Sequence, residues 1–154
     1  MAGAKDQEPY ESNIEGLVGV LIDLKTTIAG KQVYSVAGFS APAFEAVTQG
    51  EALYSRSSDG KLGKAIANDT ADKASCIGFA ETSKLTGETV SCVTHGQLAS
   101  SGLTRGSDYY LSGSSAGGIT TTPPSGSGKY LVRVGRASST TQLIVKIEAP
   151  VDRS

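Results

Sequence analysis

Closely spaced turn signals divide most of this 154-residue chain into short segments. From Lys31 onward, pairs such as Asp59-Gly60 and Thr86-Gly87 separate stretches in which apolar residues recur at every second position. Such pairs accept the positive φ that tight hairpins need, and a period of two is typical of a strand with one buried face. The pattern predicts strands at residues 32–37, 43–49, 51–57, 61–67, 74–82, 88–98, 107–113, 129–137 and 141–149.

Strands at this spacing, with no helical pattern between them, favour antiparallel pairing. We therefore expect residues 31–154 to form a mainly β domain, either an antiparallel β-sandwich or a barrel-like fold. The segment 120–128 stands out as a loop, because Pro123 and Pro124 cannot donate to a strand ladder and a Ser-Gly run follows them.

The first 30 residues follow a different pattern. Residues 1–11 are mostly polar, and we expect a flexible N-terminal arm there. Ser12 and Glu15 have the spacing of a capping box, and Gly30 stands where a left-handed helix terminator belongs. Between them apolar residues recur at spacings of 3, 4, 3 and 4, which predicts one short amphipathic or coiled-coil α-helix over 12–30. This helix seam consists of Ile14, Leu17, Leu21, Leu24 and Ile28.

The surroundings of this helix stay open at the level of sequence. A helix of little more than two heptads is marginal in isolation, and Gly16 and Gly19 each weaken it by about 1 kcal/mol relative to Ala. It can pack onto its own β domain, bundle with the same helix of sister subunits, or contact a capsid or membrane. The apolar surface extends beyond a two-stranded seam, so a bundle is expected to be a homotrimer with the helix seam as its oligomer contact. The additional apolar residues are Val18, Val20 and Ile22.

Charge and hydropathy exclude several classes of partner. With 14 basic and 15 acidic residues, the chain lacks the basic field that binding to nucleic acid or to an anionic membrane requires. No segment approaches the roughly 20 apolar residues that span a bilayer. Acidic residues precede the short apolar run 17–24, so we expect no signal peptide. Cys76 and Cys92 are expected to be buried free thiols, while a cross-strand disulfide stays an alternative.

Motifs for catalysis are weak. His95 is the single histidine, and the nearby Cys92 would point to the opposite face of a strand, so we expect a structural histidine in a turn before Gly96. One histidine and two cysteines do not make a zinc site without carboxylates. Residues 125–130 lack the spacing of a phosphate-binding loop, and 113–118 resemble an esterase elbow by composition. We expect a protein that is not an enzyme, with no catalytic residues, no cofactor and no metal.

A series of short motifs between residues 41 and 150 carries a resemblance to a known class of proteins. Its elements, in order, are GEALY at 50–54, DGK at 59–61, GFA at 78–80, GETV at 87–90, YYLS at 109–112, GGIT at 117–120, the proline pair, and VGRA at 134–137. The order is similar to that of the small β domains of tailed-bacteriophage virion proteins. These include capsid-decoration and head-fibre proteins and the terminal modules of tail fibres.

The resemblance implies a non-enzymatic structural component of a phage virion. As a decoration (cement) or head-fibre protein, it would bind and stabilise the outer surface of the capsid, where symmetric neighbours let weak contacts add up. The implied partners are the major capsid protein and further copies of the chain itself. The implied location is the capsid surface of the virion, after synthesis in the host cytoplasm. The alternative is a tail-fibre or receptor-binding module whose loop 112–128 contacts the host surface.

Overall fold

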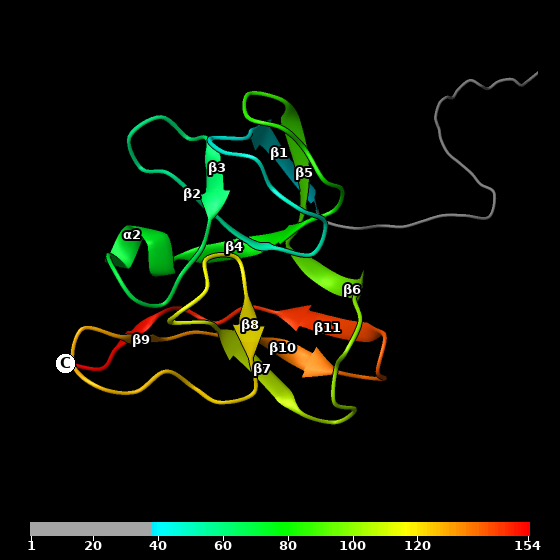
Figure 1. Ribbon diagram of the computed structural model, residues 1–154, viewed down its shortest axis with the longest axis vertical. Helices are drawn as coiled ribbons and strands as arrows, with labels where there is room; N and C mark the ends of the chain where they lie inside the picture. Colours follow the sequence, from blue (N-terminus) through cyan, green and yellow to red (C-terminus); the bar gives the residue numbers. More distant parts are fainter. Residues whose placement is uncertain (1–37) are drawn as a thin grey trace, which may run out of the picture. The chain divides into compact units, whose positions relative to one another are not determined.

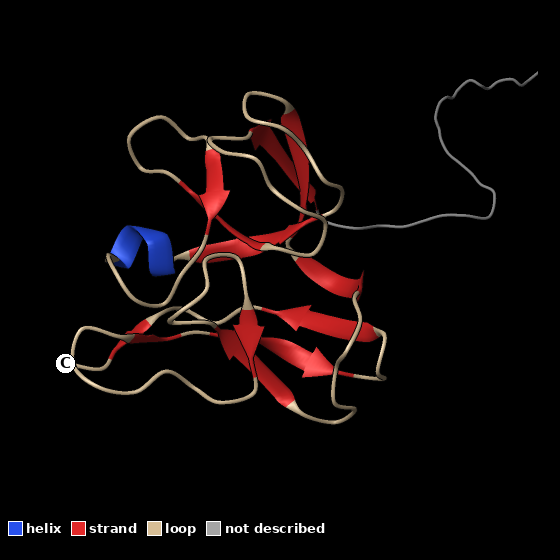
Figure 2. Ribbon diagram, viewed as in Figure 1, coloured by secondary structure: helices blue, strands red, loops and turns tan. Residues whose placement is uncertain are grey.

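The computed structural model describes residues 38–154 of the chain. Their elements form two five-stranded sheets and a separate two-stranded ladder (Figure 1; Figure 2). In chain order the elements are β1 (Gly38–Pro42), β2 (Ala52–Ser55), β3 (Leu62–Lys64), α2 (Ala71–Ala74), β4 (Cys76–Ala80), β5 (Thr89–Val93), β6 (His95–Ala99), β7 (Asp108–Leu111), β8 (Ile119–Thr120), β9 (Tyr130–Leu131), β10 (Arg133–Ala137), β11 (Gln142–Lys146) and β12 (Val151–Asp152).

Neighbouring strands pair in antiparallel fashion within each sheet. Sheet 1 has the strand order β1-β5-β4-β2-β3, and sheet 2 has the order β6-β11-β10-β7-β8, while β12 pairs with β9. The prediction of a mainly β fold with antiparallel sheets is therefore confirmed. The predicted arm at 1–11 and the predicted helix at 12–30 lie outside the described residues.

A single residue carries the chain from sheet 1 to sheet 2. β5 ends at Val93 and β6 begins at His95, so Thr94 alone lies between them (Figure 1). The prediction of one strand over 88–98 is therefore wrong, because this run bends and serves two sheets. Gly96 has a φ of 100°, a backbone conformation that glycine adopts at little cost. Bends of this kind allow one stretch of chain to join two packed sheets.

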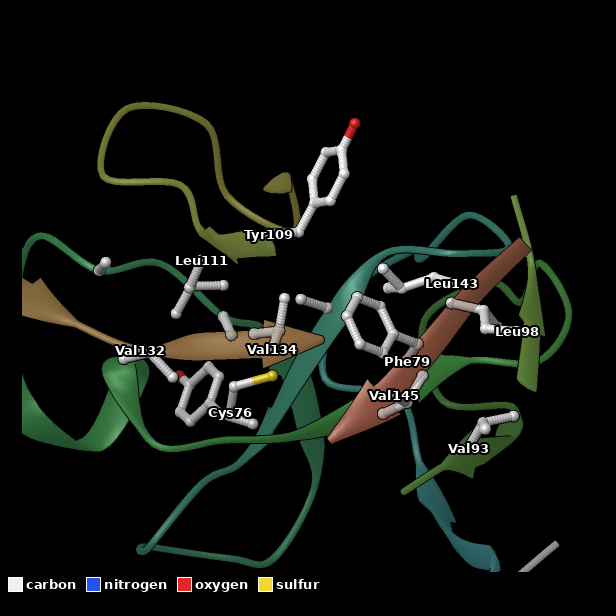
Figure 3. Close-up of a cluster of buried hydrophobic side chains, with 14 of the residues drawn as sticks. Cys76, Phe79, Val93, Leu98, Tyr109, Leu111, Val132, Val134, Leu143 and Val145 are labelled. Carbon is white, nitrogen blue, oxygen red and sulfur yellow. The ribbon is translucent and has the colours of Figure 1, made fainter. Parts of the chain in front are cut away.

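The first core cluster draws side chains from both sheets. Phe79 and Cys76 come from sheet 1, whereas Leu111, Val134 and Leu143 come from sheet 2. Figure 3 shows the Phe79 ring in the middle of the labelled side chains. Burying a side chain of this size contributes about 1.5–3 kcal/mol. The packing of the two sheets against each other therefore depends on this cluster.

The second core cluster lies on the other face of sheet 1. Ala43, directly after β1, forms a bridge with Leu62 of β3, at the opposite end of the strand order. The Phe44 amide also donates to the Leu62 carbonyl at 2.7 Å. Sheet 1 thus curls around this cluster, and β2 is buried on both faces as a result. The members of the cluster are Ala43, Val47, Leu53, Leu62, Ala80, Val90 and Cys92.

Residues 43–49 close this curled sheet and do not form the predicted strand. Within this segment only Ala43 and Val47 make isolated bridges. The amides of Val47 and Lys84 each donate to the other residue's carbonyl at 2.9 Å, which holds the segment against residues 84–88. The apolar alternation arises because Ala43 and Val47 contribute to the second cluster.

A helix of four residues, α2, separates β3 from β4. Thr70 is its N-cap residue, and the hydroxyl oxygen accepts a hydrogen bond from the Lys73 amide at 3.2 Å. Ala74 is buried in the first core cluster and fixes the helix to the domain. The period-two pattern gives no sign of α2, because four residues are too few to show a helical period.

Candidate functional site

The turn between β7 and β8 forms one wall of the candidate site. Ser112 is the one buried polar side chain of the described residues. Its hydroxyl oxygen accepts hydrogen bonds from the amides of Ser114 at 3.1 Å and Ser115 at 3.0 Å. The Ser112 amide donates to the carbonyl of Gly118 at 2.9 Å and closes the turn. The side chain of Ser112 therefore holds the shape of this turn from inside.

The loop that contains the proline pair forms the second wall. The Thr122 amide donates to the Thr120 hydroxyl oxygen at 3.1 Å, which starts the loop with a local turn. A methyl group added at Gly113 would lie 3.1 Å from Pro124 Cβ and 3.6 Å from Lys129 Cδ. Pro124 and the aliphatic part of Lys129 therefore pack directly over Gly113.

Asn68, which follows β3 by four residues, connects the two walls. Asn68 forms an antiparallel bridge with Lys129. The Ala67 amide donates to the Ser112 carbonyl at 2.8 Å, and the Tyr130 amide donates to the Ala67 carbonyl at 2.9 Å. Three segments far apart in the sequence are thereby held together by backbone hydrogen bonds.

Together these segments line an open cleft of about 510 Å³. The lining contains hydroxyl, amide and proline groups and one cation, with no carboxylate, histidine, cysteine or aromatic side chain. Its chemistry suits the binding of a polar ligand by hydrogen bonds. The lining residues are Asn68, Ser112, Gly113, Ser114, Thr120, Thr122, Pro123, Pro124, Ser125 and Lys129.

The serine-rich turn beside this cleft has the letters of a nucleophile elbow but not its structure. Residues 113–117 match the pattern Gly-x-Ser-x-Gly with Ser115 at the centre. A nucleophile elbow is a sharp turn between a strand and a helix. Here the turn joins β7 to β8, two neighbouring strands. His95 lies on β6, at the opposite edge of sheet 2 from β8, so the structure does not bring a histidine to Ser115.

Cys92 and His95 also stay apart in the structure. Cys92 is buried in the second core cluster, and burial raises the pKa of its thiol to about 12. His95 is exposed at the start of β6, in the other sheet, and not in a turn. The two residues therefore do not lie on opposite faces of one strand, as predicted, but on strands of different sheets, and the structure does not pair them as nucleophile and base.

The thiols of Cys76 and Cys92 are free and buried, as predicted. Cys76 donates a hydrogen bond to the Gly78 carbonyl at 3.6 Å and belongs to the first core cluster, whereas Cys92 belongs to the second. Burial raises the pKa of Cys76 to about 12 as well. The structure has no disulfide between Cys76 and Cys92, and the two thiols belong to separate core clusters.

Charged side chains gather at one place on sheet 2. Arg133 donates to Asp108 at 2.8 Å and to Glu148 at 3.2 Å, and Arg136 donates to Asp108 at 3.3 Å. The hydrogen bond from Arg133 holds the pKa of the Asp108 carboxyl below its ordinary value. Arg133 and Asp108 are partly buried, whereas Glu148 and Arg136 are more exposed to water, which screens their ion pairs, so the cluster adds little to stability.

The predicted oligomer contacts cannot be placed in the structure. Ile14, Leu17, Leu21, Leu24 and Ile28 all lie outside the described residues. Within residues 38–154, no three side chains of His, Cys, Asp or Glu gather in a way that could hold a metal ion. The same part of the chain has no helix long and apolar enough to cross a membrane.

Sequence reasoning found part of the cleft and missed the rest. The prolines and the Ser-Gly run predict the loop at 120–128, which forms one wall of the cleft. Asn68 gave no signal, because it reaches the cleft through contacts with residues more than 40 positions away in the chain.

In the comparisons with known proteins, no family model and no curated protein sequence matches this chain.

Proposed function

We propose that this protein is a non-enzymatic structural component of a phage virion that binds and stabilises the outer surface of the capsid. The proposal rests on the order of motifs between residues 41 and 150, which resembles that of capsid-decoration and head-fibre proteins. The mainly β fold with antiparallel sheets is compatible with it. In this proposal the partners are the major capsid protein and further copies of the chain, at the capsid surface.

The finer description of the fold belongs to the same proposal. We infer that sheet 1, which the Ala43–Leu62 bridge closes toward a ring, is a small barrel-like unit. The first core cluster then joins this unit to sheet 2 in the manner of a sandwich.

Exposed apolar side chains around sheet 1 support a docking role. Phe39 on β1 is 42 % exposed, Phe44 is 44 % exposed, and Leu85 is 67 % exposed. They belong to connected segments, because residues 43–47 follow β1 and make hydrogen bonds to residues 84–88. Where such side chains form a contiguous patch, the surface is typical of places where another protein binds.

The cleft favours a second candidate, a tail-fibre or receptor-binding module. Its walls come from the loop 112–128 that such a module would present to the host surface. Receptor binding would place the functional surface at this cleft, whereas capsid decoration would place it at docking residues such as Phe39 and Phe44.

Sedimentation of the full-length protein with two targets distinguishes the candidates. One target is the capsid shell of the phage that carries this protein, assembled without the protein. The other target is whole host cells. Capsid decoration predicts saturable pelleting with shells and none with cells. Pelleting with cells alone would overturn the proposal in favour of the receptor-binding module.

A further inference from the structure

The cleft is held open by groups that have few conformations. Proline fixes its own φ, so Pro123 and Pro124 stiffen one wall. The opposite wall is held by Ser112, whose buried hydroxyl accepts two backbone hydrogen bonds. A site with both walls held in place loses less conformational freedom when a ligand binds. Its volume of about 510 Å³ also lies in the range of small-molecule pockets.

Several polar groups of the cleft are free to bind a ligand. The side chains of Asn68, Thr122 and Ser125 make no hydrogen bond with another described residue, although each lines the cleft. An amide and two hydroxyls together offer both donors and acceptors. Such a set matches a ligand that carries several hydroxyl groups of its own.

Lys129 supplies the single charge of the lining. Its aliphatic part packs over Gly113, and its ammonium group forms no ion pair within residues 38–154. No carboxylate lines the cleft to neutralise this cation. An anionic group on a ligand would therefore find a cation at Lys129 that no carboxylate of the lining neutralises.

The composition of the lining narrows the class of ligand. A nucleobase or other flat ring would need an aromatic surface for stacking, and a divalent cation would need oxygen ligands with negative charge, neither of which the lining offers. A free phosphate ion would use Lys129 but would leave most of the cleft unfilled. The half-buried rings of Pro123 and Pro124 add an apolar surface of the kind that covers the C–H face of a sugar.

We propose that this cleft binds an acidic saccharide, a pyranose unit that carries a carboxylate. Lys129 pairs with the carboxylate, Asn68, Thr122 and Ser125 exchange hydrogen bonds with the ring hydroxyls, and the proline pair packs against the ring. Capsid binding does not require this site, so the inference stands apart from the decoration role.

The test uses the full-length protein, with methyl galacturonoside as the acidic probe and methyl galactoside as its neutral match. Binding is followed by NMR titration of the amide signals of Asn68 and of residues 112–114, 120–122 and 125–129. The acidic probe is expected to bind more tightly, with shifts confined to these residues. Inorganic phosphate is a third probe, expected to bind more weakly than the uronate.

Variants separate the contribution of the charge from that of the hydroxyls. Lys129→Gln should lower the affinity for the galacturonoside by about fivefold, as expected for one exposed ion pair, and leave the galactoside unchanged. Thr122→Val should weaken both sugars. Lys146→Gln, at an exposed lysine of β11 outside the cleft, is the matched control and should change neither.

Any one of the following three results would overturn the proposal. If neither sugar shifts the signals of the cleft, the site is not a saccharide site. If phosphate binds as tightly as the uronate, the cleft is a simple anion site. If Lys129→Gln and Lys146→Gln have equal effects, the attraction is a general property of the surface. Thermal unfolding of each variant, which should match that of the native protein, shows that the fold is unchanged.

Discussion

Cys76 and Cys92 point to opposite faces of sheet 1, although their strands β4 and β5 are neighbours. Cys76 is part of the core between the two sheets, and Cys92 is part of the core inside the curled sheet. Regular alternation would place Cys76 on the face of Ala80, the residue that pairs with Cys92, but the pairing of β2 with β4 is irregular at this point, since Leu53 pairs with Gly78 and Tyr54 with Cys76. Each thiol therefore serves as a small apolar group in a different core.

The two thiols should resist modification in the folded protein. Their pKa values, raised to about 12 by burial, keep them protonated at pH 8, and the thiolate is the reactive form. We expect a disulfide-exchange reagent such as DTNB to detect no fast-reacting thiol at pH 8, and two in concentrated guanidinium chloride. A thiol that reacts within seconds in the native protein would contradict this burial.

Stability should fall as the solution becomes strongly alkaline. An unfolded chain starts to lose its thiol protons near the ordinary pKa of 9.0, whereas the folded chain keeps them to about 12. The unfolded state therefore binds fewer protons between these values, and the free energy of unfolding decreases as the pH rises from 9 toward 12. Tyr54, whose pKa burial also raises, changes stability with the same sign.

Guanidinium titrations at several pH values between 7 and 11 measure this effect. The double variant Cys76→Ala, Cys92→Ala is the control, because it removes the contribution of the thiols and keeps that of Tyr54. Its free energy of unfolding should decrease less steeply with pH than that of the native protein. Equal slopes would show that the thiols do not control the alkaline loss of stability.

Regular strands could be predicted from the sequence wherever one face of the sheet is more buried than the other. β7 and β11 alternate between buried and less buried residues, and both lie inside predicted segments. The alternation of residues 43–49 was interpreted as a strand, but it reflects Ala43 and Val47 closing the second core cluster. The local pattern of apolar residues does not distinguish a regular strand from a segment that closes a core cluster. Both place an apolar side chain at every second or fourth position.

Features that depend on distant contacts could not be predicted. The bend at Thr94 depends on the second sheet that receives β6, and nothing in the run 88–98 marks it apart from Gly96. The cleft is a similar case. Its proline loop is visible in the sequence, whereas the approach of Asn68 to Lys129 follows from strand pairing across the domain.

Phe79 should be the most sensitive position of the core between the sheets. Its side chain is fully buried, and Phe79→Ala leaves a cavity between sheets 1 and 2, which costs about 3–5 kcal/mol of unfolding free energy. Leu85→Ala is the control at a side chain 67 % exposed, with an expected change within about 0.5 kcal/mol. Similar losses for both variants in guanidinium titrations would contradict the assignment of the core.

The predicted helix seam has its own test. If Ile14, Leu17, Leu21, Leu24 and Ile28 join sister subunits, Leu21→Asp should convert a trimer to monomers that keep their β structure. Light scattering gives the mass, and circular dichroism gives the strand content. Monomers for both the native chain and the variant would contradict the bundle. An unfolded variant would show that the helix belongs to the core of a single chain.

The central claim, stabilisation of a capsid from outside, is tested most directly by the temperature at which capsid shells open. Shells assembled without this protein are heated alone and with saturating full-length protein. A shell is counted as open when a dye gains access to its interior. The account predicts that the protein binds the shells and raises the opening temperature. An unchanged opening temperature with the protein bound, or shells that bind none of it, would contradict the account.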